Sequence, residues 1–121
     1  MIRLYKPSVG TLELNSIKKV FKRSWLGYGS EVKKFEKSWS KYCGSKYSIA
    51  VNSCTAALHL SLAAQNFKKR KKVLVPVMTF SATAAAILYC DLEPVFVDIN
   101  KNDLNINYED LKKNIQKIAL R

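Results

Sequence analysis

A small polar turn, Asn52-Ser53-Cys54-Thr55, separates two apolar segments of the chain. Residues 47–51 are short and apolar and predict a buried strand, whereas residues 54–67 are rich in Ala and Leu and predict a helix. Ser53 is a suitable N-cap, and the first backbone N–H groups of such a helix have no intrahelical partner. Those free donors and the positive end of the helix dipole favour an anion, above all a phosphate. The turn therefore either binds a phosphate or simply caps a core helix, and the local pattern leaves both interpretations open.

Other residues capable of chemistry are sparse and isolated. His59 is the only histidine, and no carboxylate or cysteine is spaced to form a metal or catalytic pair with it, which favours a packed structural role. Cys43, Cys54 and Cys90 are odd in number and include no Cys-x-x-Cys pair, as expected for free thiols in a reducing cytoplasm. The spacing thus predicts no catalytic residue and no metal site.

Length and composition indicate one globular domain. The 121 residues are 48% hydrophobic and 11% aromatic, enough to build a core. No apolar run reaches the length of a membrane span, and the N-terminus has no stretch of signal-peptide length. We therefore expect a cytoplasmic protein with no membrane partner.

The formal net charge of +12 raises the alternative of a basic nucleic-acid-binding module. The densest basic run, residues 68–72, lies between a predicted helix and a predicted strand, where a solvated connector is expected. No zinc spacing, aromatic RNA motif or recognition helix accompanies it, so binding to nucleic acid is the weaker hypothesis.

Helices and strands alternate along the predicted chain. Apolar spacing predicts a helix over residues 12–25 with Thr11 as a cap, a loop at residues 27–29, and a second helix that begins at Ser30 and ends before Gly44. Further on we expect a strand at 72–75, a helix at 81–89 capped by Ser81 or Thr83, a turn at 93–94, a strand at 95–98 and a helix at 108–119 capped by Asn107. This order is typical of a parallel α/β architecture.

Five sequence motifs, in order, resemble the N-terminal part of the DegT/StrS-type sugar aminotransferases. They are Gly27-Tyr28-Gly29-Ser30-Glu31-Val32 with Phe35-Glu36, Tyr42-Cys43-Gly44-Ser45-Lys46-Tyr47, Ala50-Val51-Asn52-Ser53-Cys54-Thr55-Ala56-Ala57-Leu58, Val75-Pro76 with Thr79-Phe80-Ser81-Ala82-Thr83, and Pro94-Val95-Phe96-Val97-Asp98. The resemblance covers roughly residues 12–115. It implies a pyridoxal 5'-phosphate (PLP) enzyme of the aspartate aminotransferase fold, fold type I.

The resemblance assigns roles to six residues. Ser53, Thr55 and Ala56 match the turn that binds the PLP phosphate, and Phe80 matches the aromatic residue that stacks on the pyridine ring. From its spacing alone, Phe80 would be a core residue. Trp25 and Tyr28 match the N-terminal loop that borders the substrate site.

The implied activity is transfer of an amino group, commonly from glutamate, to a nucleotide-linked keto-sugar for polysaccharide or natural-product synthesis, in a homodimer. Residues 1–30 would form an N-terminal arm and helix, and residues 31–121 the first, truncated portion of the PLP-binding large domain. No segment matches the family's aspartate that pairs with the pyridinium nitrogen or its cofactor-binding lysine, so we expect the chain to be inactive alone. A non-catalytic partner of a lysine-bearing subunit is the alternative.

The implied topology also predicts an incomplete parallel sheet with flanking helices. In this fold the first strand and the next two lie near opposite edges of a seven-stranded sheet, with strands from later sequence between them. Residues 49–51 would therefore lack a neighbouring strand, and strand edges and apolar helix faces would be exposed.

Overall fold

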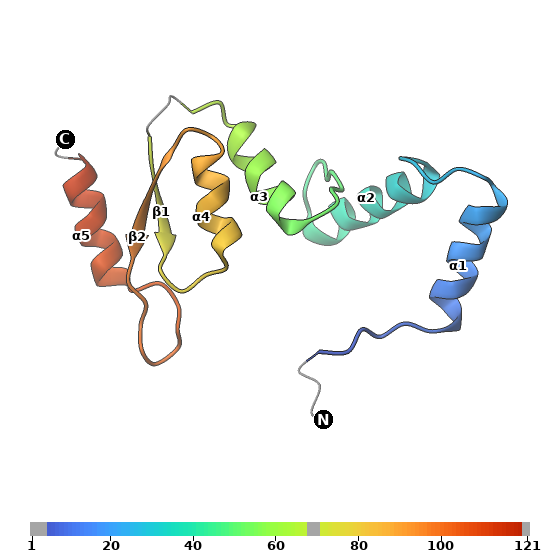
Figure 1. The fold of residues 1–121 in the computed structure, drawn as a ribbon, viewed down its shortest axis with the longest axis horizontal. Helices are drawn as coiled ribbons and strands as arrows, with labels where there is room; N and C mark the ends of the chain where they lie inside the picture. The colour runs from blue at the N-terminus through green and yellow to red at the C-terminus, as the bar shows by residue number, and fades with distance from the viewer. Residues whose placement is uncertain (1–4, 68–70, 120–121) are drawn as a thin grey trace. The chain divides into compact units, whose positions relative to one another are not determined.

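The computed structural model describes residues 5–67 and 71–119, which divide into two compact units, Met1–Ala50 and Val51–Arg121. The first unit contains helices α1 (Thr11–Lys22) and α2 (Ser30–Cys43). The second contains α3 (Cys54–Ala63), β1 (Lys72–Pro76), α4 (Ser81–Leu88), β2 (Glu93–Val97) and α5 (Tyr108–Ala119) (Figure 1). The predicted domain division at residue 30 refers to a whole enzyme and stays a prediction.

The second unit is built on a parallel pair of strands. β1 and β2 run in register from Lys72 opposite Glu93 to Pro76 opposite Val97, and α4 connects them and packs on both (Figure 1). α3 packs against α4, and α5 packs against β2. The predicted α/β class, with a parallel sheet and flanking helices, is confirmed.

All the buried residues among those that the structure describes lie in this second unit. Its most buried side chains are apolar: Val75, Ala86, Ile87, Leu92 and Val97. Leu62, Val73 and Cys90 pack partly buried against them. No residue of α1 or α2 is buried, and rings such as those of Phe21 and Trp39 are at least half exposed. The predicted exposure of apolar helix faces is thus present in the described residues.

The predicted strand at residues 47–51 is wrong. The segment has no regular secondary structure, and within the described residues the sheet consists of β1 and β2 alone. A strand exists only through a ladder of hydrogen bonds to a neighbour. The Ala50 N–H donates instead to Glu36 Oε1, at 2.9 Å.

Several predicted helix and strand boundaries also need correction. α1 begins at Thr11 with Gly10 as its N-cap, and it ends at Lys22, before Ser24 at φ 52°. α3 ends at Ala63 rather than residue 67. Left-handed residues such as Ser24, and Asn66 at φ 50° after α3, cannot continue a helix. Residues 93–94 begin β2 instead of forming a turn.

Other predicted boundaries are confirmed. α2 ends at a left-handed Gly44 with φ 69°, and α5 spans Tyr108–Ala119 with the Asn107 Oδ1 accepting from the Asp110 N–H at 3.0 Å. Residues 68–70 of the predicted basic connector lie outside the described residues. None of the described helices is long and apolar enough to cross a membrane.

Replacing Val97 by Ala tests the core. Its side chain is fully buried, so we expect V97A to lower the free energy of unfolding by about 2 kcal/mol, measured by urea unfolding followed by circular dichroism. V77A, at a residue that is 54% exposed, is the matched control and should change it little. Equal effects of the two variants would contradict this core.

Candidate functional site

The amino end of α3 presents open backbone donors. The Ser53 Oγ accepts from the Ala56 N–H at 3.1 Å, and the Ser53 carbonyl accepts from the Ala57 N–H at 3.1 Å, so the predicted cap is confirmed. No described residue accepts a hydrogen bond from the N–H of Cys54 or Thr55. Ser53, Cys54 and Thr55 are exposed. Capping and anion binding are therefore compatible at this turn, because the cap uses only the third N–H group.

The charge pattern at α3 also suits an anion. α3 carries no acidic residue in its first turn, whereas α5 has Glu109 and Asp110 in the equivalent position. Carboxylates in the first turn offset the helix dipole and repel a bound anion. α3 has no such carboxylate, so the positive end of its dipole remains available to an external anion.

Phe80 lies immediately before α4, in the loop that follows the carboxyl end of β1. It is the N-cap residue of α4, and its side chain is 79% exposed, so its ring is free to contact a ligand. The predicted caps are wrong: no side chain caps α4, and the Thr83 hydroxyl lies 2.9 Å from that of Thr79. Ligands of α/β proteins bind beyond the carboxyl ends of the strands, which is where Phe80 is placed.

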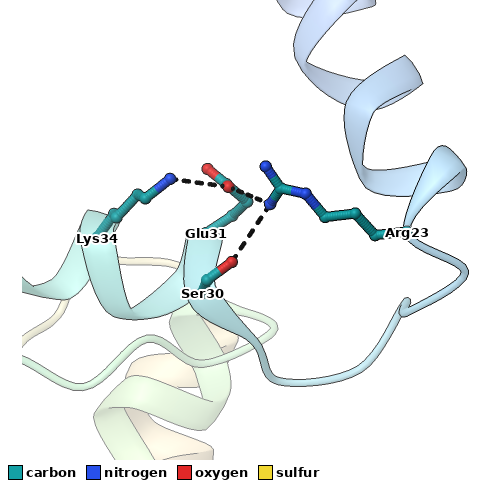
Figure 2. A network of polar contacts seen from close by, with 4 residues as sticks. All are labelled: Arg23, Ser30, Glu31 and Lys34. Carbon is teal, nitrogen blue, oxygen red and sulfur yellow. Dashed lines mark hydrogen bonds and ion pairs between the residues drawn. The ribbon is translucent and has the colours of Figure 1, made fainter.

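In the first unit, an ion-pair network closes the loop between α1 and α2 (Figure 2). The Arg23 Nη1 lies 2.8 Å from the Glu31 Oε1 and donates to the Ser30 Oγ at 3.3 Å. The Lys34 Nζ lies 3.0 Å from the same Glu31 oxygen. Hydrogen bonds from Arg23 and then Lys34 lower the pKa of Glu31, which stays an ionised anchor for both cations.

Trp25 folds back over this loop. Its indole N–H donates to the Tyr28 carbonyl at 3.1 Å, and a Cβ added to Gly29 would lie 2.9 Å from the Trp25 Cδ1. Only glycine therefore allows this close approach of the ring. A cavity of about 220 Å³ lies beside the indole, lined by residues that include Val20, Arg23 and Leu26.

The Tyr28 side chain is held by a carboxylate to which the sequence analysis assigned no role. Its hydroxyl donates to the Glu36 Oε2 at 2.6 Å. This hydrogen bond raises the pKa of Tyr28 and, together with the bond from the Ala50 N–H, lowers the pKa of Glu36. Glu36 belongs to the first of the five sequence motifs, but its spacing of eight residues from Tyr28 does not predict a contact between them.

The predicted site residues are divided between the two units. Trp25 and Tyr28 share one loop of the first unit, and Ser53, Thr55 and Ala56 share one turn of the second. Phe80 lies in the second unit, before the helix against which α3 packs.

His59 shows a packed environment. It is half-buried, and its ring lies edge-on to Tyr89 with 5.5 Å between ring centroids. The described residues contain no group of three or more metal-binding side chains.

Comparison with known proteins identifies the family of this chain. The sequence profile of the DegT/DnrJ/EryC1/StrS aminotransferase family matches residues 7–119. The chain belongs to this family. The resemblance drawn from the five motifs is thereby confirmed.

Individual relatives share the same region. The spore coat polysaccharide biosynthesis protein SpsC of Bacillus subtilis is 40% identical over 84% of this chain and 26% of its own length. The dTDP-4-dehydro-2,3,6-trideoxy-D-glucose 4-aminotransferase of Saccharopolyspora spinosa is 33% identical over 95% of this chain and 30% of its own.

A solved structure, GDP-4-keto-6-deoxymannose-3-dehydratase with a trapped PLP-glutamate geminal diamine, matches with a TM-score of 0.87 and 32% identity. The match covers 92% of this chain and 30% of that one. The chain therefore has the fold of the corresponding part of these PLP enzymes, and it spans roughly 30% of the length of the relatives it matches.

Replacing Gly29 by Ala tests the packing of the loop. The added methyl group would push the indole away and weaken its bond to the Tyr28 carbonyl, so we expect G29A to shift the Trp25 fluorescence to the red, measured in a W39F background.

G27A is the matched control for this variant. A Cβ at Gly27 meets the indole at an ordinary contact distance of 3.6 Å and should leave the emission unchanged. An unshifted spectrum for G29A would mean that the indole does not lie against this glycine.

Proposed function

We propose that this chain forms part of the PLP site of an aminotransferase that moves an amino group from glutamate to a nucleotide-linked keto-sugar. The observation that carries the proposal is the pair of open N–H groups, Cys54 and Thr55, at the start of α3. Family membership and the names of the relatives support it, because they include a nucleotide-sugar 4-aminotransferase and a structure containing PLP and glutamate. A dehydratase is also among the relatives, so amino transfer is the finer part of the proposal.

The residues at the turn fit the phosphate of PLP. The N–H groups of Cys54 and Thr55 would donate to phosphate oxygens, and the hydroxyls of Ser53 and Thr55 would add side-chain donors. The Ala56 N–H is already bonded to the Ser53 Oγ, so Ala56 contributes mainly a small side chain that lets the anion approach.

Phe80 fits the flat ring of the cofactor. Its exposed aromatic face would pack on the pyridine ring and fix its tilt, in the region beyond the carboxyl end of β1. PLP, when bound, supplies an electron sink for the carbon that carries the transferred amino group. The role of this chain is to hold the phosphate and to orient the ring.

Trp25 and Tyr28 would contact the sugar substrate. Both side chains are more than half exposed and offer an aromatic face. The Trp25 N–H is already bonded to the Tyr28 carbonyl, so Trp25 would contribute its ring alone. The whole enzyme would be a homodimer, as the family resemblance implies. It would lie in the cytoplasm, which the three free thiols in the described residues support. Polysaccharide synthesis is the process named for SpsC.

The phosphate site can be tested with an analogue that cannot react with lysine. 4'-Deoxypyridoxine 5'-phosphate lacks the aldehyde of PLP, which matters because the chain is rich in lysine. We expect it to slow amide hydrogen exchange at residues 54–57, measured by NMR, whereas 4'-deoxypyridoxine without the phosphate should not. S53A and T55V should weaken the effect about tenfold, because each removes a donor to a charged group.

S61A, at an exposed position in the interior of α3, is the matched control and should bind as the unchanged chain does. Equal protection by the phosphate-free compound, or unchanged exchange of the Cys54 and Thr55 amides with the phosphate analogue, would overturn the proposal.

A further inference from the structure

Glu36 connects three segments of the first unit through one carboxylate. It projects from α2, its Oε2 accepts from the Tyr28 hydroxyl at 2.6 Å, and its Oε1 accepts from the Ala50 N–H at 2.9 Å. The comparisons with known proteins assign no role to this residue. Both oxygens are used within the chain, so Glu36 acts on its neighbours rather than on a ligand.

We propose that Glu36 is a positioning residue that commits the Tyr28 hydroxyl proton to its own carboxylate, so that Tyr28 offers a ligand only an acceptor oxygen. The consequence for the substrate rests on the proposed function, in which Tyr28 borders the sugar. The geometry carries the proposal, because a separation of 2.6 Å between an O–H donor and a carboxylate is that of a strong, charge-assisted hydrogen bond.

The donor and acceptor inventory then defines the class of group that Tyr28 recognises. An ionised carboxylate can only accept, and a phenol has a single proton to give. With that proton held by Glu36, the phenol oxygen keeps only lone pairs for a ligand. Its partner in a ligand must be a hydrogen-bond donor, such as a sugar hydroxyl or amino group. An ionised phosphate oxygen can only accept, so it cannot bond to the Tyr28 oxygen.

The surrounding charges agree with this protonation pattern. Lys33 is the cation that faces the pair: its Nζ lies 6.0 Å from the centroid of the Tyr28 ring, and its charge helps to lower the pKa of Glu36. Glu36 raises the pKa of Tyr28, which keeps the phenol protonated at neutral pH and above. The interaction is lost when pH rises through the pKa of Tyr28 or falls through that of Glu36.

The test is a pH titration of Tyr28 in the whole chain, followed by NMR of tyrosine labelled with 13C at Cζ and assigned with Y28F. We expect E36Q to lower the pKa of Tyr28 towards its ordinary value of about 10, because the negative charge is gone. The same variant should keep the Ala50 amide protected from hydrogen exchange, since the Gln oxygen still accepts. E36A should lower the pKa and also speed Ala50 exchange about tenfold.

E109Q is the matched control, because Glu109 is an exposed carboxylate in the first turn of α5, in the second unit, whereas Tyr28 lies in the first. It should leave the pKa of Tyr28 unchanged. A Tyr28 pKa that is the same in the unchanged chain, E36Q and E36A would overturn the proposal. The titration uses neither cofactor nor sugar, so its outcome is independent of whether the phosphate analogue binds.

Discussion

The parallel pairing of β1 with β2 is the constraint on which the buried part of this structure depends. Parallel strands cannot be joined by a tight turn, so the chain must return through a crossover, which here is α4. That crossover brings Ile87 against Val75, and Leu92 at its end completes the cluster. The described residues of the first unit form two helices and no strand, and none of them is buried. The buried core of the described residues therefore forms around the paired strands β1 and β2.

The same constraint explains why the amino end of α3 keeps its form although the preceding strand does not appear. A ladder needs a second strand, which residues 47–51 do not have among the described residues. A helix cap needs only a side chain three residues away, and Ser53 supplies it to Ala56. The two open N–H groups beside this cap are therefore a local property of the turn. The anion site proposed at the start of α3 therefore depends on this turn and not on a strand at residues 47–51.

Predictions from the sequence mostly succeeded where the cause is local and failed where it depends on a distant part of the chain. The end of α2 at Gly44 and the Asn107 cap of α5 follow from single residues with definite backbone or hydrogen-bonding preferences, and both were predicted. The strand predicted at residues 47–51 from apolar composition is absent, because composition does not show whether a neighbour exists. The topology implied by the resemblance did predict that residues 49–51 lack a neighbouring strand, and none pairs with them in the described residues. The early ends of α1 and α3 depend on left-handed residues after each helix, Ser24 and Asn66, which composition does not mark.

The site shows the same division. Ser53 was found from helix physics, whereas Phe80 looked like a core residue until the family resemblance was considered, and its ring proves to be exposed. Neither helix physics nor the family resemblance predicted a role for Glu36, because its contact with Tyr28 joins a loop residue to a helix residue eight positions later. The hydrogen bonds and ion pairs that hold the loop between α1 and α2, such as that of Arg23 with Glu31, nevertheless span at most eight residues. The bond from the Ala50 N–H to Glu36 is the longer-range exception. A loop held by such short-range contacts can present its aromatic rings in a defined arrangement before any ligand arrives, which reduces the entropy lost on binding.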